Sequence, residues 1–156
     1  MSNVEMAHSL LIQHHDMAQN ESFSKRSERL ALRILRFYRL LRRRTDVPPY
    51  LADQLLRAGT SIGANLQEAV SAYSRKELAA RQSVALRESR ECRFWLFLVG
   101  QDQPQTSAEV SELSEECSQF VAMLTTSVRK LKAKRKKKTD NETEDGETIG
   151  GEVVGP

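Results

Sequence analysis

The run Ser61-Ile62-Gly63-Ala64-Asn65-Leu66-Gln67-Glu68-Ala69 lies near the middle of a 156-residue chain and decides its fold class. Apolar and small residues recur here at steps of three and four, which predicts a helix that begins at about Pro49. Its stripe consists of Leu55, Gly59, Ile62, Leu66, Ala69 and Tyr73. Gly59 and Gly63 each cost about 1 kcal/mol in a helix interior relative to alanine. We therefore expect them to allow close approach of a neighbouring backbone.

Three more helices are predicted around this one. The first begins near Ser24 and stops before Pro48, the third begins at the capping sequence Ser74-Arg75-Lys76-Glu77, and the fourth follows Thr106. No segment alternates with period two, so strands are not expected. We predict an all-α protein, an antiparallel up-down four-helix bundle over residues 24–133. A polar, flexible N-terminal arm (1–23) and a basic-then-acidic disordered tail (134–156) flank it.

Charge is sorted along the chain in a way that the net charge of +3 conceals. Residues 25–44 carry nine basic groups against Glu28 alone, and residues 129–138 carry eight against none. Residues 139–156 hold six acids and no base. The acidic segment could fold back on the basic arm before it and compete with phosphate.

The basic residues of the first helix form a ridge, because at 100° per residue they fall within an arc of roughly 100°. The ridge consists of Lys25, Arg26, Arg29, Arg33, Arg36 and Arg43. Arginine presents a planar fork that matches phosphate oxygens and gains from counterion release. The basic arm suggests the same chemistry through Arg129, Lys130, Lys132, Lys134 and Arg135. Two alternatives stay open: acids from other helices neutralise the ridge, and the arm is only a solvated terminus.

A second long run, Ala85-Leu86-Arg87-Glu88-Ser89-Arg90-Glu91-Cys92-Arg93-Phe94-Trp95-Leu96, opens an apolar segment that extends to Val99. Six consecutive apolar residues cover more than one helical turn, so a single core does not hide them all. We predict that Phe94, Trp95, Phe97 and Leu98 meet another subunit. In the alternative, the following loop and the N-terminal arm wrap this helix end.

Ser61, Asn65 and Glu68 lie together on one flank of the second helix. This trio could act as general acid/base machinery, but no histidine, cysteine or second carboxylate accompanies it in the local sequence, and we predict no catalytic site. We expect a structural polar motif in which Arg87, Arg90 or Glu91 on the third helix supplies hydrogen-bond partners.

Together, the two runs resemble the small bacterial four-helix-bundle proteins of the 23S rRNA intervening-sequence family, over residues 25–132. The matching pattern is Ser-Ile-x-Ala-Asn-Ile-x-Glu-Ala, then Ala-Leu-x-Glu-Ser-x-Glu and a Trp-Leu pair, with Leu66 here in place of the usual isoleucine. The resemblance implies a ring-like homo-oligomer, specifically a pentamer. A related branch of accessory proteins works with a reverse transcriptase in diversity-generating retroelements. No catalytic activity comes with the resemblance.

Metal and cofactor chemistry is not indicated. His8, His14 and His15 all lie in the N-terminal arm, which is a poor frame for a metal site. Cys92 and Cys117 are expected to be buried free thiols rather than a bridge. No apolar run is long enough to span a membrane, and we expect a cytoplasmic protein.

The sequence thus predicts a non-enzymatic oligomeric bundle that binds RNA or DNA backbone, without cofactor, metal or membrane. The alternative is a scaffold for another protein, such as a reverse transcriptase. An enzyme built on Ser61, Asn65, Glu68 and Glu91 is the third possibility, and it requires an open pocket around them.

Overall fold

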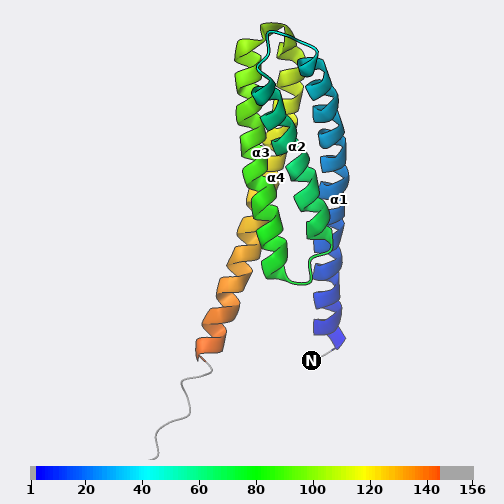
Figure 1. The fold of residues 1–156 in the computed structure, drawn as a ribbon. Coiled ribbons are helices and arrows are strands. Elements are labelled where there is room, and N and C mark those ends of the chain that lie inside the picture. Colours follow the sequence, from blue (N-terminus) through cyan, green and yellow to red (C-terminus); the bar gives the residue numbers. More distant parts are fainter. Residues whose placement is uncertain (1–2, 145–156) are drawn as a thin grey trace, which may run out of the picture.

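The structure is a computed structural model that describes the backbone of residues 3–144 and the side chains of residues 23–133. It contains helices α1 (Asn3–Arg42), α2 (Pro49–Val70), α3 (Arg75–Asp102) and α4 (Ser107–Glu144), with a short 3-10 helix, η1 (Pro104–Thr106), before α4. Over residues 3–144 there is no strand. The all-α prediction with four helices is therefore confirmed (Figure 1).

Two helices are longer than the sequence predicted. α1 begins at Asn3 rather than near Ser24, and α4 continues past residue 133 to Glu144. Neither extension contains a glycine or proline, so nothing in the local sequence stops helix propagation. The flexibility predicted for residues 1–23 and 134–156 stays a prediction.

The core is built from one apolar face of each of the four helices. Each helix packs along its successor, whereas α1 and α4 approach each other closely at few positions. Fully buried members include Ile34 of α1, Ile62 of α2, Leu96 of α3 and Phe120 of α4. No helix among residues 3–144 is long and apolar enough to cross a membrane.

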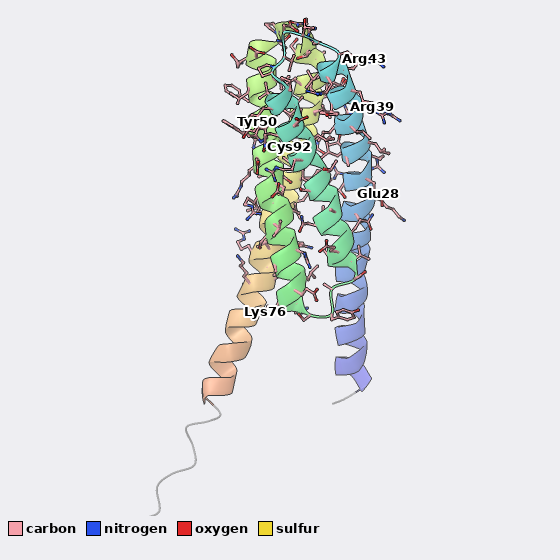
Figure 2. All side chains as sticks on the ribbon, viewed as in Figure 1. Glu28, Arg39, Arg43, Tyr50, Lys76 and Cys92 are labelled. Atoms are coloured by element: carbon pink, nitrogen blue, oxygen red, sulfur yellow. The ribbon has the colours of Figure 1, made fainter. Side chains whose placement is uncertain are left out.

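The two cysteines meet inside this core, as expected for buried free thiols. Cys92 of α3 and Cys117 of α4 are both free, and their sulfur atoms lie 3.5 Å apart. Figure 2 shows Cys92 among the packed helices. The Cys92 pKa is raised well above 9.0 by its hydrogen bond with Cys117 and by burial, both of which disfavour the thiolate.

The two interior glycines of α2 face different neighbours. A Cβ on Gly59 would lie 2.3 Å from Cδ1 and 2.9 Å from Cγ2 of Ile34, so a side chain occupies this space rather than the expected backbone. A Cβ on Gly63 would lie 3.6 Å from the Ser27 carbonyl oxygen, in ordinary contact. Backbone does approach Gly63, but of these two positions only Gly59 needs to be glycine.

The prediction that Tyr73 belongs to the buried stripe of α2 is wrong. α2 ends at Val70, so helical spacing does not reach Tyr73, and this side chain is 98% exposed. The following residue, Ser74, caps α3 as predicted, because its hydroxyl accepts a hydrogen bond of 3.1 Å from the Glu77 N–H.

Candidate nucleic-acid interface

The predicted basic ridge of α1 divides into two groups of residues with different surroundings. Arg33 is half-buried and faces α4. Its guanidinium donates to Glu116 at 2.9 Å, to Glu112 at 2.8 Å and to Glu109 at 3.4 Å. Burial would lower the Arg33 pKa, but the three carboxylates outweigh burial and raise it. Acids from another helix thus neutralise this part of the ridge, which was the alternative left open.

Arg26 is also committed to α4. It donates to Gln119 at 2.7 Å and to the Met123 sulfur at 3.2 Å, and its guanidinium carbon lies 5.5 Å from the centre of the Phe120 ring. Long arginine side chains therefore cover the seam at which the α1 and α4 backbones stay apart. Neither Arg26 nor Arg33 is presented to an outside partner.

The remaining arginines of the ridge, Arg29, Arg36 and Arg43, are exposed on the outer face of α1. Arg39 belongs with them, although sequence reasoning left it out. Its spacing of one turn from both Arg36 and Arg43 was the available signal. Arg39 and Arg43 point away from the other helices in Figure 2.

These four arginines make no ion pair with any described carboxylate, that is, among residues 23–133. Lys25 is also exposed, and Glu28, the acid of this helix segment, bonds to Gln67 of α2. Among residues 23–133, Arg29, Arg36, Arg39 and Arg43 therefore form an array of positive charge with which no carboxylate is paired. We call Arg29, Arg36, Arg39 and Arg43 the α1 outer face.

The basic arm is described only in part. Arg129, Lys130 and Lys132 are exposed on α4. The side chains of Lys134 and Arg135 lie outside the described residues, as do those of His8, His14 and His15. Among residues 23–133, no group of three or more acidic, histidine or cysteine side chains could hold a metal ion.

The four residues of the predicted polar motif do not form one closed network. Asn65 donates to the Ser61 carbonyl oxygen at 2.9 Å, within its own helix. Glu68 pairs with Arg81 of α3. Glu91 instead accepts from Arg57 of α2 and, at 3.2 Å, from the Trp95 indole N–H.

Arg57 is the residue that sequence reasoning missed in this motif. It joins Glu91 to Glu88, whose carboxylate is buried and lies 3.5 Å from the guanidinium. Arg87, one of the predicted partners, contacts Glu88 at 3.3 Å. Arg57 lies one turn before Ser61 on the same flank of α2, which was a usable signal.

The aromatic residues of α3 are only partly covered. Phe94 is 52% and Phe97 58% exposed, whereas Trp95 and Leu98 are half-buried. Trp95 lies edge-on to Phe94 at 5.1 Å and to Tyr50 of α2 at 6.0 Å. α2 thus covers part of the apolar segment, and Phe94 and Phe97 stay open to a further surface.

Known proteins resemble this chain both in sequence and in fold. Residues 19–126 match the family described as 23S rRNA-intervening sequence protein, and no curated protein matches the sequence. A protein with unknown function from the S23 ribosomal protein family of Bacteroides thetaiotaomicron VPI-5482 has a similar structure, with a TM-score of 0.63 and 28% identity. That match covers 68% of this chain and 97% of the other. The family match spans well over half of the sequence, and this chain therefore belongs to the 23S rRNA-intervening sequence protein family.

Proposed function

We propose that this protein is a non-enzymatic cytoplasmic oligomer that binds the backbone of RNA or DNA through the α1 outer face and the basic end of α4. The observation that carries the proposal is that Arg29, Arg36, Arg39 and Arg43 are exposed and make no ion pair among the described residues. Like charges repel along a helix face, and bound phosphates would offset that repulsion.

Little sequence readout is expected from such a surface. Phosphate contacts position a protein on nucleic acid without distinguishing bases. Because Arg26 and Arg33 are bound to side chains of α4, we do not include them among the phosphate-binding residues. Arg39 joins the remaining arginines of the predicted ridge. The family description names ribosomal RNA, which agrees in kind with an RNA ligand.

Self-association belongs to the same proposal. We infer an antiparallel up-down arrangement of the four helices and a ring of copies joined through the exposed side of α3. Phe94 and Phe97 supply two large apolar side chains that one copy leaves open. Repeating the α1 outer face around a ring would build a continuous positive belt and strengthen phosphate binding.

A scaffold for another protein, for instance a reverse transcriptase, is the second candidate. It is favoured by the arginines that accompany Phe94 and Phe97 on α3, since Arg90 and Arg93 are exposed. Aromatic residues with arginine are the composition of energetic centres in protein interfaces.

Fluorescence anisotropy with a structured RNA and a DNA duplex, between about 50 and 200 mM salt, tests the proposal. We expect log affinity to fall linearly with log salt. The double substitution R36Q/R43Q should reduce the steepness of the plot of log affinity against log salt by about 1 for each phosphate contact that it removes. R90Q/R93Q removes the same charge from α3 and is the matched control, with light scattering to confirm an unchanged oligomeric state. No binding at the lowest salt would overturn the nucleic-acid proposal and favour the scaffold.

A further inference from the structure

Tyr73 is the most exposed large hydrophobic side chain among the described residues, and nothing in the fold uses it. It lies in the connection between α2 and α3, and 98% of its surface is open to solvent. A hydrophobic residue directly before a helix cap commonly packs against the fourth residue of that helix, here Leu78. At this exposure Tyr73 does not make that packing contact.

The backbone of Tyr73 is nevertheless fixed. Its N–H donates to the Glu77 carboxylate at 3.1 Å, and the hydroxyl of the next residue, Ser74, accepts from the Glu77 N–H. The capping interaction therefore anchors the chain on both sides of the Tyr73 side chain. The ring is presented from a fixed turn, which lowers the entropy lost when a partner stacks on it.

Apart from the Glu77 carboxylate, which accepts from the Tyr73 N–H, the charged residues next to Tyr73 in the sequence are cations. Arg75 and Lys76 follow it and are both exposed, and Lys76 lies at the α2–α3 connection in Figure 2. Glu68, the nearest preceding acid in the sequence, is paired with Arg81. Figure 1 shows α4 continuing past this same end of the molecule. Arg129, Lys130 and Lys132 are exposed on the last part of α4 whose side chains are described.

We infer that Tyr73 is a stacking platform for an unpaired base of a single-stranded nucleic acid, whose phosphates are held by Lys76 and the basic end of α4. The inference rests on the proposed function and names its ligand class. Sequence-tolerant single-strand binding combines cations that hold the backbone with aromatic rings on which bases stack, and Tyr73 supplies one such ring. A protein-docking surface would need a contiguous apolar patch. Among the described residues, Val70 is the only large apolar side chain of the last turn of α2 that is exposed near Tyr73 in the sequence.

The test compares a short oligothymidylate with an abasic strand of the same length, which keeps the phosphates and lacks the bases. The wild-type protein should bind the base-bearing strand about 5- to 150-fold more tightly, the range that one stacked base provides. Y73A should remove most of this preference and leave affinity for the abasic strand unchanged. Y73F keeps the ring and should keep the preference. Because the side chain is exposed, both variants should melt as the wild type does by circular dichroism.

The outcomes separate the two proposals. If wild type binds both strands and Y73A keeps the wild-type preference for bases, Tyr73 is not the platform and backbone binding stands. Equal wild-type affinity for the two strands would overturn the stacking inference and would leave the proposed backbone binding intact. If no strand and no duplex binds at the lowest salt, the proposed function fails and stacking fails with it. A quenched 2-aminopurine signal with wild type and Y73F, but not with Y73A, would support the assignment directly.

Discussion

Arg33 and Arg36 lie one turn apart on α1 but have opposite environments. Arg33 holds three carboxylates of α4, and Arg36 has no acidic partner among residues 23–133. We expect R33A to lower the free energy of unfolding by roughly 1–2 kcal/mol, since it leaves Glu109, Glu112 and Glu116 to repel one another. R36A should change it by less than about 0.5 kcal/mol. Urea denaturation of both variants measures the difference.

The Arg33 effect is electrostatic, so it should respond to neutralisation of a neighbour. Adding E112Q to R33A should recover part of the lost stability, because Glu112 is the most exposed of the three acids and its removal relieves repulsion without opening the core. Equal stability of R33A and R36A would contradict the assignment of Arg33 to the α1–α4 seam.

Glu91 connects the fold to pH. Burial alone would raise its pKa, but hydrogen bonds from Trp95 and Arg57 outweigh burial and hold the pKa below the ordinary 4.5. Because the folded pKa is the lower one, Glu91 contributes its stability above pH 4.5, and that contribution is lost as pH falls through the folded pKa. E91Q should therefore lose less stability than wild type across the acid range.

Thermal melts from neutral pH down into the acid range test this prediction. W95F keeps a ring but removes the indole N–H, so it should shift the acid response in the same direction as E91Q and by less. An E91Q curve parallel to the wild-type curve at every pH would mean that Glu91 does not couple folding to protons.

At the scale of helix pairs, alanine substitutions at the two interior glycines of α2 should change the free energy of unfolding in opposite directions. Replacing an interior helical glycine by alanine normally stabilises by about 1 kcal/mol. G63A meets only ordinary contacts and should gain up to that amount. G59A should instead destabilise by about 1–3 kcal/mol, because rotation of Ile34 about χ2 moves Cδ1 but leaves Cγ2 in the way. Parallel urea titrations of G59A and G63A measure both signs, and a stabilising G59A would show that α1 and α2 can move apart without cost.

Helix identity was readable from sequence because each stripe repeats over many turns. Leu55, Gly59, Ile62 and Leu66 of α2 are all buried where periodicity placed them. Helix ends were not readable in the same way. The spacing of Tyr73 continues the α2 stripe, and only the early end of the helix at Val70 turns this residue outward.

The position of the candidate interface on α1 could be predicted from the sequence, but which of its arginines are available to a ligand could not. Projection of α1 finds the basic ridge, but it carries no information on which flank α4 covers. The pairing of Arg33 with α4 and the bridge from Arg57 to Glu88 and Glu91 both depend on side chains more than 30 positions away. Local spacing therefore names candidate cations, and tertiary packing decides which of them stay available.

At the scale of the whole molecule, the reactivity of the two buried thiols measures how readily α3 separates from α4. Cys92 and Cys117 are fully buried, and the raised Cys92 pKa lowers the fraction of reactive thiolate. We expect neither thiol to react with Ellman's reagent in the native protein near neutral pH, and both to react once denaturant separates α3 from α4. A cysteine introduced at exposed Ser111 is the control and should react at once. Rapid native labelling of the two core thiols would show that α3 and α4 separate readily.

Assembly is the second property of the whole molecule that a variant can test. F94S/F97S should shift the protein toward smaller species in light scattering at equal concentration, because it removes the exposed apolar surface of α3. The substitutions preserve charge and leave the α1 outer face intact, and L32S/L40S, on exposed leucines of α1, serves as the matched control. An unchanged mass for F94S/F97S would place any assembly surface elsewhere.

The bridge from Arg57 to Glu88 and Glu91 also limits how this sequence can change over generations. Loss of Arg57 would leave the buried Glu88 carboxylate with Arg87 as its one remaining cation among the described residues, and a poorly paired buried carboxylate is costly. Replacement of Glu88 by a neutral residue of similar size should therefore come before loss of Arg57. Positions 57, 88 and 91 should therefore vary together among descendants, and the order of substitution should be neutral amide first, arginine second.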